Sequence, residues 1–528
     1  MTSTSSTDVE WKKRSVVSSF IFKFDGGQPQ VALFRRSDKV STYRQHLAPI
    51  SGSINPADAS PLAAAWREIR EETTLTPESL SLLRQGKSYS FRDESIRREW
   101  TVFPFLFRLK TPEDEQRIRI DWEHDGWEWH HPDIVIRDSE GAIGGVPRLA
   151  ESLRRVWFET DLGPQAGAVL SSGLEALSQD HESGARQLAT AALQTLREAI
   201  AAMEEPDGKP TEEWWAKVRF MSWHLWKNGR ESMGAAIMSA LLTALGNIER
   251  VVKEVQKTAS RRDAVLNQID HQITARQEAA KLISQAFGAY LARAFPSKLA
   301  SNQPITILTL SESSTIRQGL RYAALNSGFI LDLHILESRP LYEGVSLAGS
   351  LAEDLLSTSS ASRTHKITLY SDASAALASS AVDLVVLGAD RIAASGAVSN
   401  KTGSLPAVLS AKHISPRARV VVLGDSDKIG TPGHPEDHVV EDNDDSQISR
   451  AWQAEYNSAR VRHAATTLQN LKSPESRLKL EIRNVFFEWV SADLIDAYVT
   501  ESGEWTLQQI AEHSSRLEVE EKRFFESL

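Results

Sequence analysis

Hydrophobic and polar residues are arranged in different ways along the chain, and the N-terminal part has the texture of β-structure. Residues 15–22 and 30–34 are rich in β-branched and aromatic side chains and flank the pair Gly26-Gly27. Two such runs around a glycine pair predict a β-hairpin. Residues 101–107 predict another strand, in which Pro104 indicates a sheet edge or a bulge because proline has no N–H to donate.

The middle of the chain predicts helices. Residues 165–300 are rich in Ala, Leu, Glu, Gln and Arg, with few β-branched clusters, and Pro and Gly at 205–210 predict a break. Residues 233–287 fit either a coiled coil or helices that pack onto neighbours. No heptad pattern continues without interruption, so packing onto neighbouring helices is favoured.

From Pro304 onward, short apolar runs alternate with helical stretches. Continuous apolar strands of this kind are typical of a parallel sheet covered on both faces, and the pattern predicts a doubly wound, Rossmann-like α/β domain. The predicted strands cover residues 305–309, 330–336, 366–370, 384–387 and 419–423.

Composition limits the kinds of protein this chain can be. With 528 residues and 41% hydrophobic content, we expect about three packed domains. We expect a cytoplasmic protein with no membrane segment, because no window approaches about 18 uninterrupted apolar residues and the first residues do not resemble a signal peptide. The net charge of −10 argues against non-specific nucleic-acid binding, and the absence of cysteine excludes disulfides, thiolate metal sites and thiol nucleophiles.

The strongest chemical signal is the run Arg67-Glu68-Ile69-Arg70-Glu71-Glu72. On a helix, Glu68, Glu71 and Glu72 fall within an arc of roughly 100°, so all three carboxylates can point toward one cation. A hard ion such as Mg²⁺ prefers carboxylate oxygens together with substrate phosphate. For this run alone, an ordinary acidic helix face is an equally good interpretation.

The residues around this run resemble the Nudix box. Gly52 and Asp58 keep the family's spacing, although eight residues rather than seven precede Arg67 and Thr74 replaces the closing glycine. The resemblance implies a Nudix α/β/α sandwich over residues 10–160 that hydrolyses a nucleoside diphosphate derivative with Mg²⁺ or Mn²⁺. It also implies roles for individual residues: metal binding by Glu68, Glu71, Glu72 and Glu123, catalysis by the first three, and structural support from Gly52 and Arg67.

Polar segments follow the predicted C-terminal strands. Because ligands of such sheets bind beyond the carboxyl ends of the strands, a hydroxyl-rich rim there favours a phosphorylated ligand. For any single segment, an ordinary helix cap is the better interpretation. The segments are residues 311–315, 337–340, 371–372, 388–391 and 424–428.

Several of these segments resemble one superfamily. It joins the α, β and δ subunits of initiation factor 2B with methylthioribose-1-phosphate and ribose-1,5-bisphosphate isomerases, and the resemblance covers residues 165–510. It implies a helical domain at 165–300 and a Rossmann-like domain at 301–515. The matching motifs are residues 180–185, 229–233, 309–314, 337–340 with 343–344, 387–392, 400–403, Lys428, 484–488 and 499–503.

The resemblance implies a site in this half. Asp390 matches the isomerases' catalytic acid and base, and Ser311 stands where they have a cysteine. A serine hydroxyl exchanges protons less readily than a thiol, so isomerisation by the family route should be slow or absent. The substrate-binding residues implied are Arg230, Arg339, Asn400, Lys401 and Lys428.

Three functions therefore stay open for the C-terminal half. We favour binding of a phosphorylated pentose or nucleotide, ahead of a subunit-like assembly module with initiation-factor contacts and of an aldose–ketose isomerase that tolerates serine. The resemblance also implies a homodimer. A Nudix reaction that releases a phosphorylated pentose would supply the second site with its ligand at high local concentration.

Overall fold

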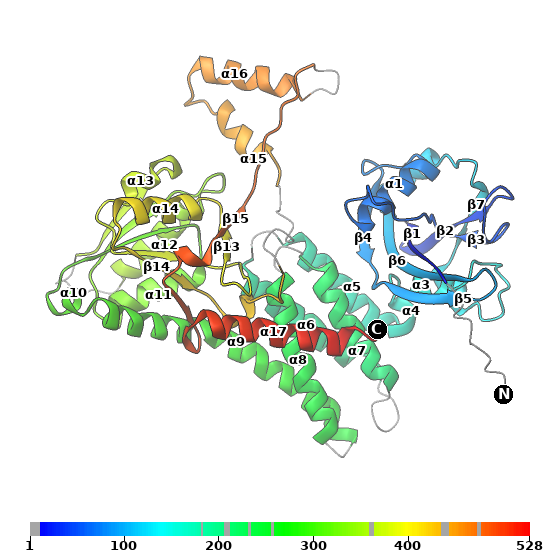
Figure 1. Cartoon of the computed structure of the whole chain (residues 1–528), viewed down its shortest axis with the longest axis horizontal. Coiled ribbons are helices and arrows are strands. Elements are labelled where there is room, and N and C mark those ends of the chain that lie inside the picture. Colours follow the sequence, from blue (N-terminus) through cyan, green and yellow to red (C-terminus); the bar gives the residue numbers. More distant parts are fainter. Residues whose placement is uncertain are drawn as a thin grey trace, which may run out of the picture. The chain divides into compact units, whose positions relative to one another are not determined.

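The computed structural model describes residues 11–180, 183–204, 212–230, 234–254, 258–357, 364–433, 443–472 and 477–528 (Figure 1). The predicted break at 205–210 and parts of two predicted motifs, residues 181–182 and 231–233, lie outside these ranges. Contacts divide the chain into two compact units. The first holds Met1–Ser178, Thr195–Gly229 and Leu528, and the second holds Gln179–Gln194 and Arg230–Ser527. The three predicted domain ranges stay a prediction.

The first unit contains a mixed sheet with the strand order β3-β2-β1-β6-β4; β5 pairs with β6 and β7 with β2. β1 and β6 are parallel, and the other pairs are antiparallel. The strands are β1 (Lys12–Asp25), β2 (Gln28–Arg36), β3 (Leu47–Ala48), β4 (Leu80–Gln85), β5 (Tyr89–Asp93), β6 (Arg98–Leu109) and β7 (His124–His130). The predicted hairpin is confirmed, with Gly26 and Gly27 both at positive φ in its turn.

Of the two alternatives predicted for Pro104, an edge or a bulge, the edge is wrong, and the register irregularity of the β4–β6 pair lies between Leu82 and Arg84 of β4. β6 is a central strand, paired with β1 along one side and with β4 and β5 along the other. Pro104 lies between the stretch that pairs with β5 and the stretch that pairs with β4, and its carbonyl accepts a bond from the Gly86 N–H at 2.8 Å. The missing N–H therefore falls where neither strand needs a donor.

Helices cover both faces of this sheet, which confirms the α/β/α sandwich. α1 (Pro61–Thr73) packs Ala64, Ala65 and Ile69 on one face, while α2 (Pro132–Arg137) and α3 (Leu149–Arg154) pack on the other. The remaining helices that lie wholly or mainly in this unit are η1 (Pro112–Arg117), α4 (Glu159–Leu162), α5 (Pro164–Gln179) and α7 (Glu212–Asn228). α6 (Ala185–Ala202) contributes residues to both units.

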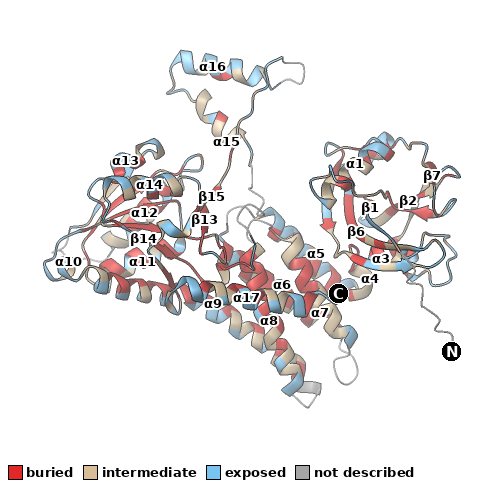
Figure 2. Ribbon diagram, viewed as in Figure 1, coloured by how far each residue is buried: buried red, intermediate tan, exposed pale blue. Residues whose placement is uncertain are grey.

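The second unit contains the predicted Rossmann-like sheet, with the strand order β10-β9-β8-β11-β14-β16-β17. All neighbours are parallel except β16 and β17. The strands are β8 (Ile305–Leu310), β9 (Leu331–Leu336), β10 (Lys366–Tyr370), β11 (Leu384–Leu387), β14 (Arg419–Leu423), β16 (Ala497–Thr500) and β17 (Gly503–Trp505). Ile305 and Ile307 enter one apolar core and Leu308 and Leu310 the other, so both faces are buried (Figure 2).

Helices and a small sheet complete the second unit. The helices are α8 (Gly234–Glu254), α9 (Thr258–Ala294), α10 (Pro296–Ala300), α11 (Ser314–Leu325), α12 (Glu343–Leu356), η3 (Asp372–Ser374), α13 (Ala375–Ala378), α14 (Ser404–Ile414), η4 (Ser426–Lys428), α15 (Ser446–Ser449), η6 (Arg450–Gln453), α16 (Ala459–Asn470), η7 (Ala492–Leu494) and α17 (Leu507–Phe525). A three-stranded sheet joins β12 (Arg391–Ile392), β13 (Val398–Lys401) and β15 (Phe487–Val490).

The long helices α8 and α9 pack against their neighbours, as the favoured interpretation of residues 233–287 predicts. α9 packs along α11, and its Ile283, Phe287 and Leu291 enter the core of the Rossmann-like sheet. Among the described residues, α8 is the one helix long and apolar enough to cross a bilayer. In its most apolar 18-residue stretch, 61% is buried inside the protein, and a buried core helix can have the same length and composition as a membrane helix.

Candidate functional site

Helix α1 carries the predicted acidic motif, and local sequence explains where the helix begins and ends. Ser60 is the N-cap, with its Oγ accepting a hydrogen bond from the Ala63 N–H at 3.1 Å, and Pro61 follows at the first helical position. At the other end Thr74 adopts the left-handed conformation, with φ 63°. Thr74 therefore has the left-handed backbone conformation that the family's glycine adopts easily, although threonine is β-branched.

Arg67 is the centre of a charged network on α1. Its guanidinium binds Asp58 through Nε and a terminal nitrogen, both at 3.0 Å, and donates to the Ser53 carbonyl at 3.0 Å. Its other terminal nitrogen binds Glu68 at 2.7 Å and Glu71 at 3.2 Å. Arg67 thus fixes the loop that precedes the helix and holds two of the predicted metal ligands by charge-assisted bonds.

Glu72 points into the domain rather than toward solvent. Its Oε2 is 2.6 Å from Nε2 of His124, at the start of β7, and both side chains are almost fully buried. Burial lowers the pKa of His124 to about 4, so the imidazole is neutral at pH 7. Burial also raises the pKa of Glu72 well above its usual value, and the nearby carboxylate of Glu123 raises it further.

The predicted acids influence one another electrostatically. Burial raises the pKa of Glu68 more than the bond from Arg67 lowers it, and Glu71 and Glu123 contribute in the same direction as burial. The pKa of Glu123 is likewise raised, first by burial and then by Asp121. Glu68, Glu71, Glu72 and Glu123 therefore concentrate negative charge in one region, and the half-buried Arg36 lies close enough to offset part of it.

Gly52 is required by the position of Glu68. A Cβ built on Gly52 would lie 1.9 Å from the carboxyl carbon of Glu68, and 2.0 and 2.5 Å from its two oxygens. Any other residue would displace this carboxylate. The glycine of the predicted motif thus creates the space in which Glu68 sits, which sequence spacing alone does not reveal.

The same residues bear on the predicted divalent metal. Within the described residues, no group of three or more Asp, Glu or His side chains stands converged as a ready ligand set, because Arg67 holds Glu68 and Glu71 while His124 holds Glu72. The donor chemistry nevertheless fits a hard cation: four carboxylates lie together, the pKa values of Glu68, Glu72 and Glu123 are raised, and Gly52 leaves room for Glu68.

Thr74 offers a local test of this helix end. Its side chain donates to the Arg117 carbonyl at 3.0 Å, but left-handed φ is costly for a β-branched residue. We expect Thr74→Gly to stabilise the helix end by about 0.5 kcal/mol, and Thr74→Ala, which keeps the strain and loses the bond, to destabilise it by a similar amount. Hydrogen exchange of residues 61–80 in the full-length chain measures both. If both variants changed the stability of the helix end in the same direction, the explanation would be wrong.

The second predicted site lies at the point where the order of the Rossmann-like sheet reverses, between β8 and β11. Ser311 directly follows β8 and Asp390 follows β11, so both leave the carboxyl ends of neighbouring strands. Ser311 has φ 63°, and its backbone N–H donates to Ser338 Oγ at 2.7 Å. This strained loop holds the serine at the place where the sheet opens.

Glu343 links two of the predicted residues. It is the first residue of α12, and its carboxylate accepts a bond from Ser311 Oγ at 3.0 Å and an ion pair from Lys401 Nζ at 3.0 Å. Lys401 also lies over the rings of Phe486 and Phe487. The sequence motif contained Glu343, but its role as the bridge between serine and lysine was missed.

Asp390 lies within a cluster of cations. Burial raises its pKa, against which Lys428, Lys401 and Arg230 act, with Lys428 the strongest of the three. Asn400 lies on the neighbouring strand β13 and donates to Ser404 Oγ at 2.9 Å. The candidate site residues Asp390, Lys401, Lys428 and Arg230 therefore lie close together, and of these Asp390 and Lys428 follow strands of the parallel sheet.

Arg339 lies at the edge of this cluster. Its backbone N–H donates to Asp372 at 2.8 Å, and its guanidinium lies over the Tyr342 ring. Arg339, Glu343 and Lys401 share the wall of a small cavity with Phe486. Arg339 thus lies near Lys401, one of the cations around Asp390.

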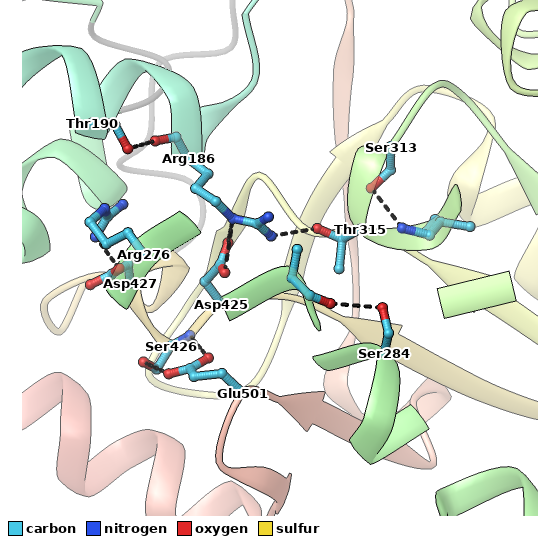
Figure 3. Close-up of polar contacts among 12 residues, drawn as sticks. Arg186, Thr190, Arg276, Ser284, Ser313, Thr315, Asp425, Ser426, Asp427 and Glu501 are labelled. Atoms are coloured by element: carbon cyan, nitrogen blue, oxygen red, sulfur yellow. Dashed lines mark hydrogen bonds and ion pairs between the residues drawn. The ribbon is translucent and has the colours of Figure 1, made fainter. Parts of the chain in front are cut away.

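Arg186 forms a further network at the end of β14 that the sequence did not indicate (Figure 3). Its Nε binds both oxygens of Asp425, at 3.1 and 3.2 Å, and a terminal nitrogen donates to Thr315 Oγ1 at 2.8 Å. Asp427 is ion-paired with Arg276 on α9 and accepts a bond from Ser239 on α8. These bonds attach helices α6, α8 and α9 to the strand ends.

Two family models match this sequence, one in each of the two regions described above. The family model "Initiation factor 2 subunit family" matches residues 181–507. The chain belongs to the initiation factor 2 subunit family. A second model, the NUDIX domain, matches residues 12–153 of this family member, which supports hydrolase chemistry in its N-terminal domain.

Curated relatives match part of this initiation factor 2 family member. A methylthioribose-1-phosphate isomerase of Stutzerimonas stutzeri is 29% identical over 187 residues, 35% of this chain and 44% of its own length. The enzyme of the same name from Vitis vinifera is 32% identical over 140 residues, 25% of this chain and 35% of its own length. The chain thus spans less than half the length of these relatives.

Solved structures of two proteins are similar at lower identity. The translation initiation factor eIF-2B of Pyrococcus horikoshii is 17% identical and has a TM-score of 0.43, over 63% of this chain and 96% of its own. The 5-methylthioribose 1-phosphate isomerase of the same organism is 18% identical with a TM-score of 0.42, over 66% and 87% of the two chains.

Proposed function

We propose that the N-terminal domain is a Mg²⁺- or Mn²⁺-dependent hydrolase of nucleoside diphosphate derivatives. The observation that carries this proposal is the concentration of four acids around α1, with Gly52 leaving the space that Glu68 occupies. Glu68, Glu71 and Glu72 would hold the ion, which supplies neutralisation of charge on the diphosphate. Arg67 positions two of these acids, and Arg36 faces the same region with a fixed positive charge.

Glu123 is the residue we assign as general base. Its raised pKa brings a carboxylate closer to the value at which a base works near neutral pH. A water oxygen attacks one phosphorus of the anhydride, the bond from that phosphorus to the bridging oxygen breaks, and Glu123 accepts the proton of the water. The test is a screen of nucleoside diphosphate derivatives with Mg²⁺ or Mn²⁺ against a chelator control, and no metal-dependent release from any of them would overturn the proposal.

For the C-terminal half we propose binding of a phosphorylated pentose rather than catalysis. Lys401, Lys428 and Arg230 gather around Asp390 at the switch point of the sheet, which suits an anionic ligand. The relatives named isomerases support the ligand class. Ser311 donates its hydroxyl to Glu343 in place of a thiol that exchanges protons, which weighs against isomerisation. Homodimer formation and initiation-factor contacts stay predictions.

Lys401→Gln is expected to weaken binding of ribose 1-phosphate to the full-length chain about tenfold, because a charge-assisted bond to the ligand is lost. Isothermal titration calorimetry measures the affinity. Lys412→Gln is the matched control: Lys412 lies on α14 in the same unit and pairs with Asp496. Undetectable binding of ribose 1-phosphate to the unaltered chain would favour an assembly role instead, and turnover of the sugar would favour the isomerase.

A further inference from the structure

The second unit contains a cavity that belongs to neither site described above. Its volume is about 710 Å³, which falls in the range of small-molecule binding sites. It is enclosed by α8, α9, α17 and the loop after β14, and Arg186 contributes to one wall. Neither Ser311, Asp390 nor Lys401 lines it.

Two buried polar atoms in the wall have no hydrogen-bond partner within the described part of the chain. One is Nε of Arg276, whose side chain is only 7% exposed and whose terminal nitrogen is paired with Asp427 (Figure 3). The other is Oε1 of Gln272, whose amide nitrogen donates to the Ala240 carbonyl at 2.8 Å. Arg276 and Gln272, on adjacent turns of α9, therefore leave one donor and one acceptor unsatisfied beside the cavity, and buried groups of this kind are costly unless a ligand or water satisfies them.

His513 on α17 adds a second donor. Its Nδ1 accepts a bond from the Arg516 guanidinium at 2.7 Å. Because burial lowers its pKa to about 4, the ring is neutral, and its proton therefore resides on Nε2. Nε2 is also buried without a partner in the described residues.

The described residues of the cavity wall include six basic and five acidic side chains, a net charge of +1. Four of these carboxylates are ion-paired: Asp425 with Arg186, Asp427 with Arg276, Glu249 with Arg523 and Lys253, and Glu520 with Arg523. The fifth, Glu501, accepts hydrogen bonds from the uncharged Ser426. By contrast, Arg250 and Arg516 line the cavity, are exposed, and make no ion pair with a carboxylate of the described residues. An incoming anion meets two available guanidinium groups.

We propose that this cavity binds a small sugar phosphate. The phosphate pairs with Arg250 and Arg516, while ring hydroxyls donate to Gln272 Oε1 and accept from Arg276 Nε and His513 Nε2. Leu242, Ala279 and Leu517 supply the apolar surface for the carbon skeleton. The described residues of the lining include no Trp, Tyr or Phe on which a nucleobase would stack, which favours a sugar phosphate over a nucleotide.

Titration calorimetry of the full-length chain with ribose 5-phosphate tests this proposal. The double variant Arg250→Gln, Arg516→Gln is expected to weaken one binding event at least about tenfold, since two charge-assisted bonds are lost. Both side chains are exposed, so folding should not suffer, and an unchanged melting temperature checks this. Lys522→Gln is the matched control, because Lys522 lies on α17 and pairs with Glu518 away from the cavity wall.

One further ligand and one further variant make the outcome decisive. Uncharged ribose should bind at least about tenfold more weakly than ribose 5-phosphate. The variant Asp390→Asn should leave the Arg250- and Arg516-dependent event intact. Absence of any binding of ribose 5-phosphate, or binding that Asp390→Asn weakens and the double arginine variant does not, would overturn the proposal.

Discussion

Replacing Glu71 and Glu72 together by Gln is expected to lower metal-dependent hydrolysis by about 10³-fold or more in kcat/KM. Removal of two carboxylates deprives the divalent ion of most of its proposed ligands, and the ion is worth several kcal/mol of charge stabilisation in the transition state. Initial rates of phosphate or nucleotide release with Mg²⁺, on the substrate found in the screen, measure the effect. The side chains keep their size, so packing should be unchanged.

The stability of this variant separates a functional role from a structural one. Burial and neighbouring carboxylates raise the pKa of Glu72 in the folded protein. At a pH above the ordinary pKa of a glutamate, ionised Glu72 therefore lowers the free energy of unfolding. Neutral glutamine removes that cost, so we expect stability to be unchanged or higher while activity is lost. Glu78→Gln, at an exposed position just beyond α1, controls for loss of one negative charge. Retained turnover in the double variant would show that the motif is not catalytic.

The secondary structure was predictable because its signals are local. Apolar runs of four to seven residues predicted five of the six parallel strands, β8, β9, β10, β11 and β14 but not β16, and Gly26-Gly27 predicted the hairpin. The sheet edge predicted from Pro104 was wrong because the sequence of one strand does not show its partners. Strands β5 and β4 both pair with the same side of β6 and leave a gap opposite the proline.

The proximity of some candidate site residues was predictable, but the hydrogen bonds and ion pairs among them were not. Helical spacing grouped Glu68, Glu71 and Glu72, yet nothing local indicates that Glu72 bonds His124, 52 positions away, or that Arg67 holds the other two. Strand ends grouped Ser311 with Asp390. The bridge through Glu343 depends on how α12 packs near β9. This is a tertiary contact, which local sequence does not indicate.

Gly344→Ala is expected to destabilise the second unit by about 2–3 kcal/mol, at the upper end of the cost of overpacking. A Cβ at this position would lie 1.8 Å from the carbonyl oxygen of Leu336, at the end of β9. Backbone cannot swing aside as a side chain does, so the start of α12 must move away from the strand. Thermal unfolding of the full-length chain and hydrogen exchange in α12 measure the loss.

Gly349→Ala is the matched control on the same helix. Gly349 is exposed, a Cβ there meets nothing within 4 Å, and alanine is the better helix former, so this variant should gain about 0.5–1 kcal/mol. The two substitutions are identical and lie five residues apart, but they should change the stability in opposite directions. This difference separates the effect of the close contact between helix and strand from the effect of helix propensity. Because Gly344 follows Glu343, its substitution should also break the bridge between Ser311 and Lys401, whereas Gly349→Ala should leave binding of ribose 1-phosphate intact. Equal stability of the two variants would mean that α12 does not need its close contact with β9.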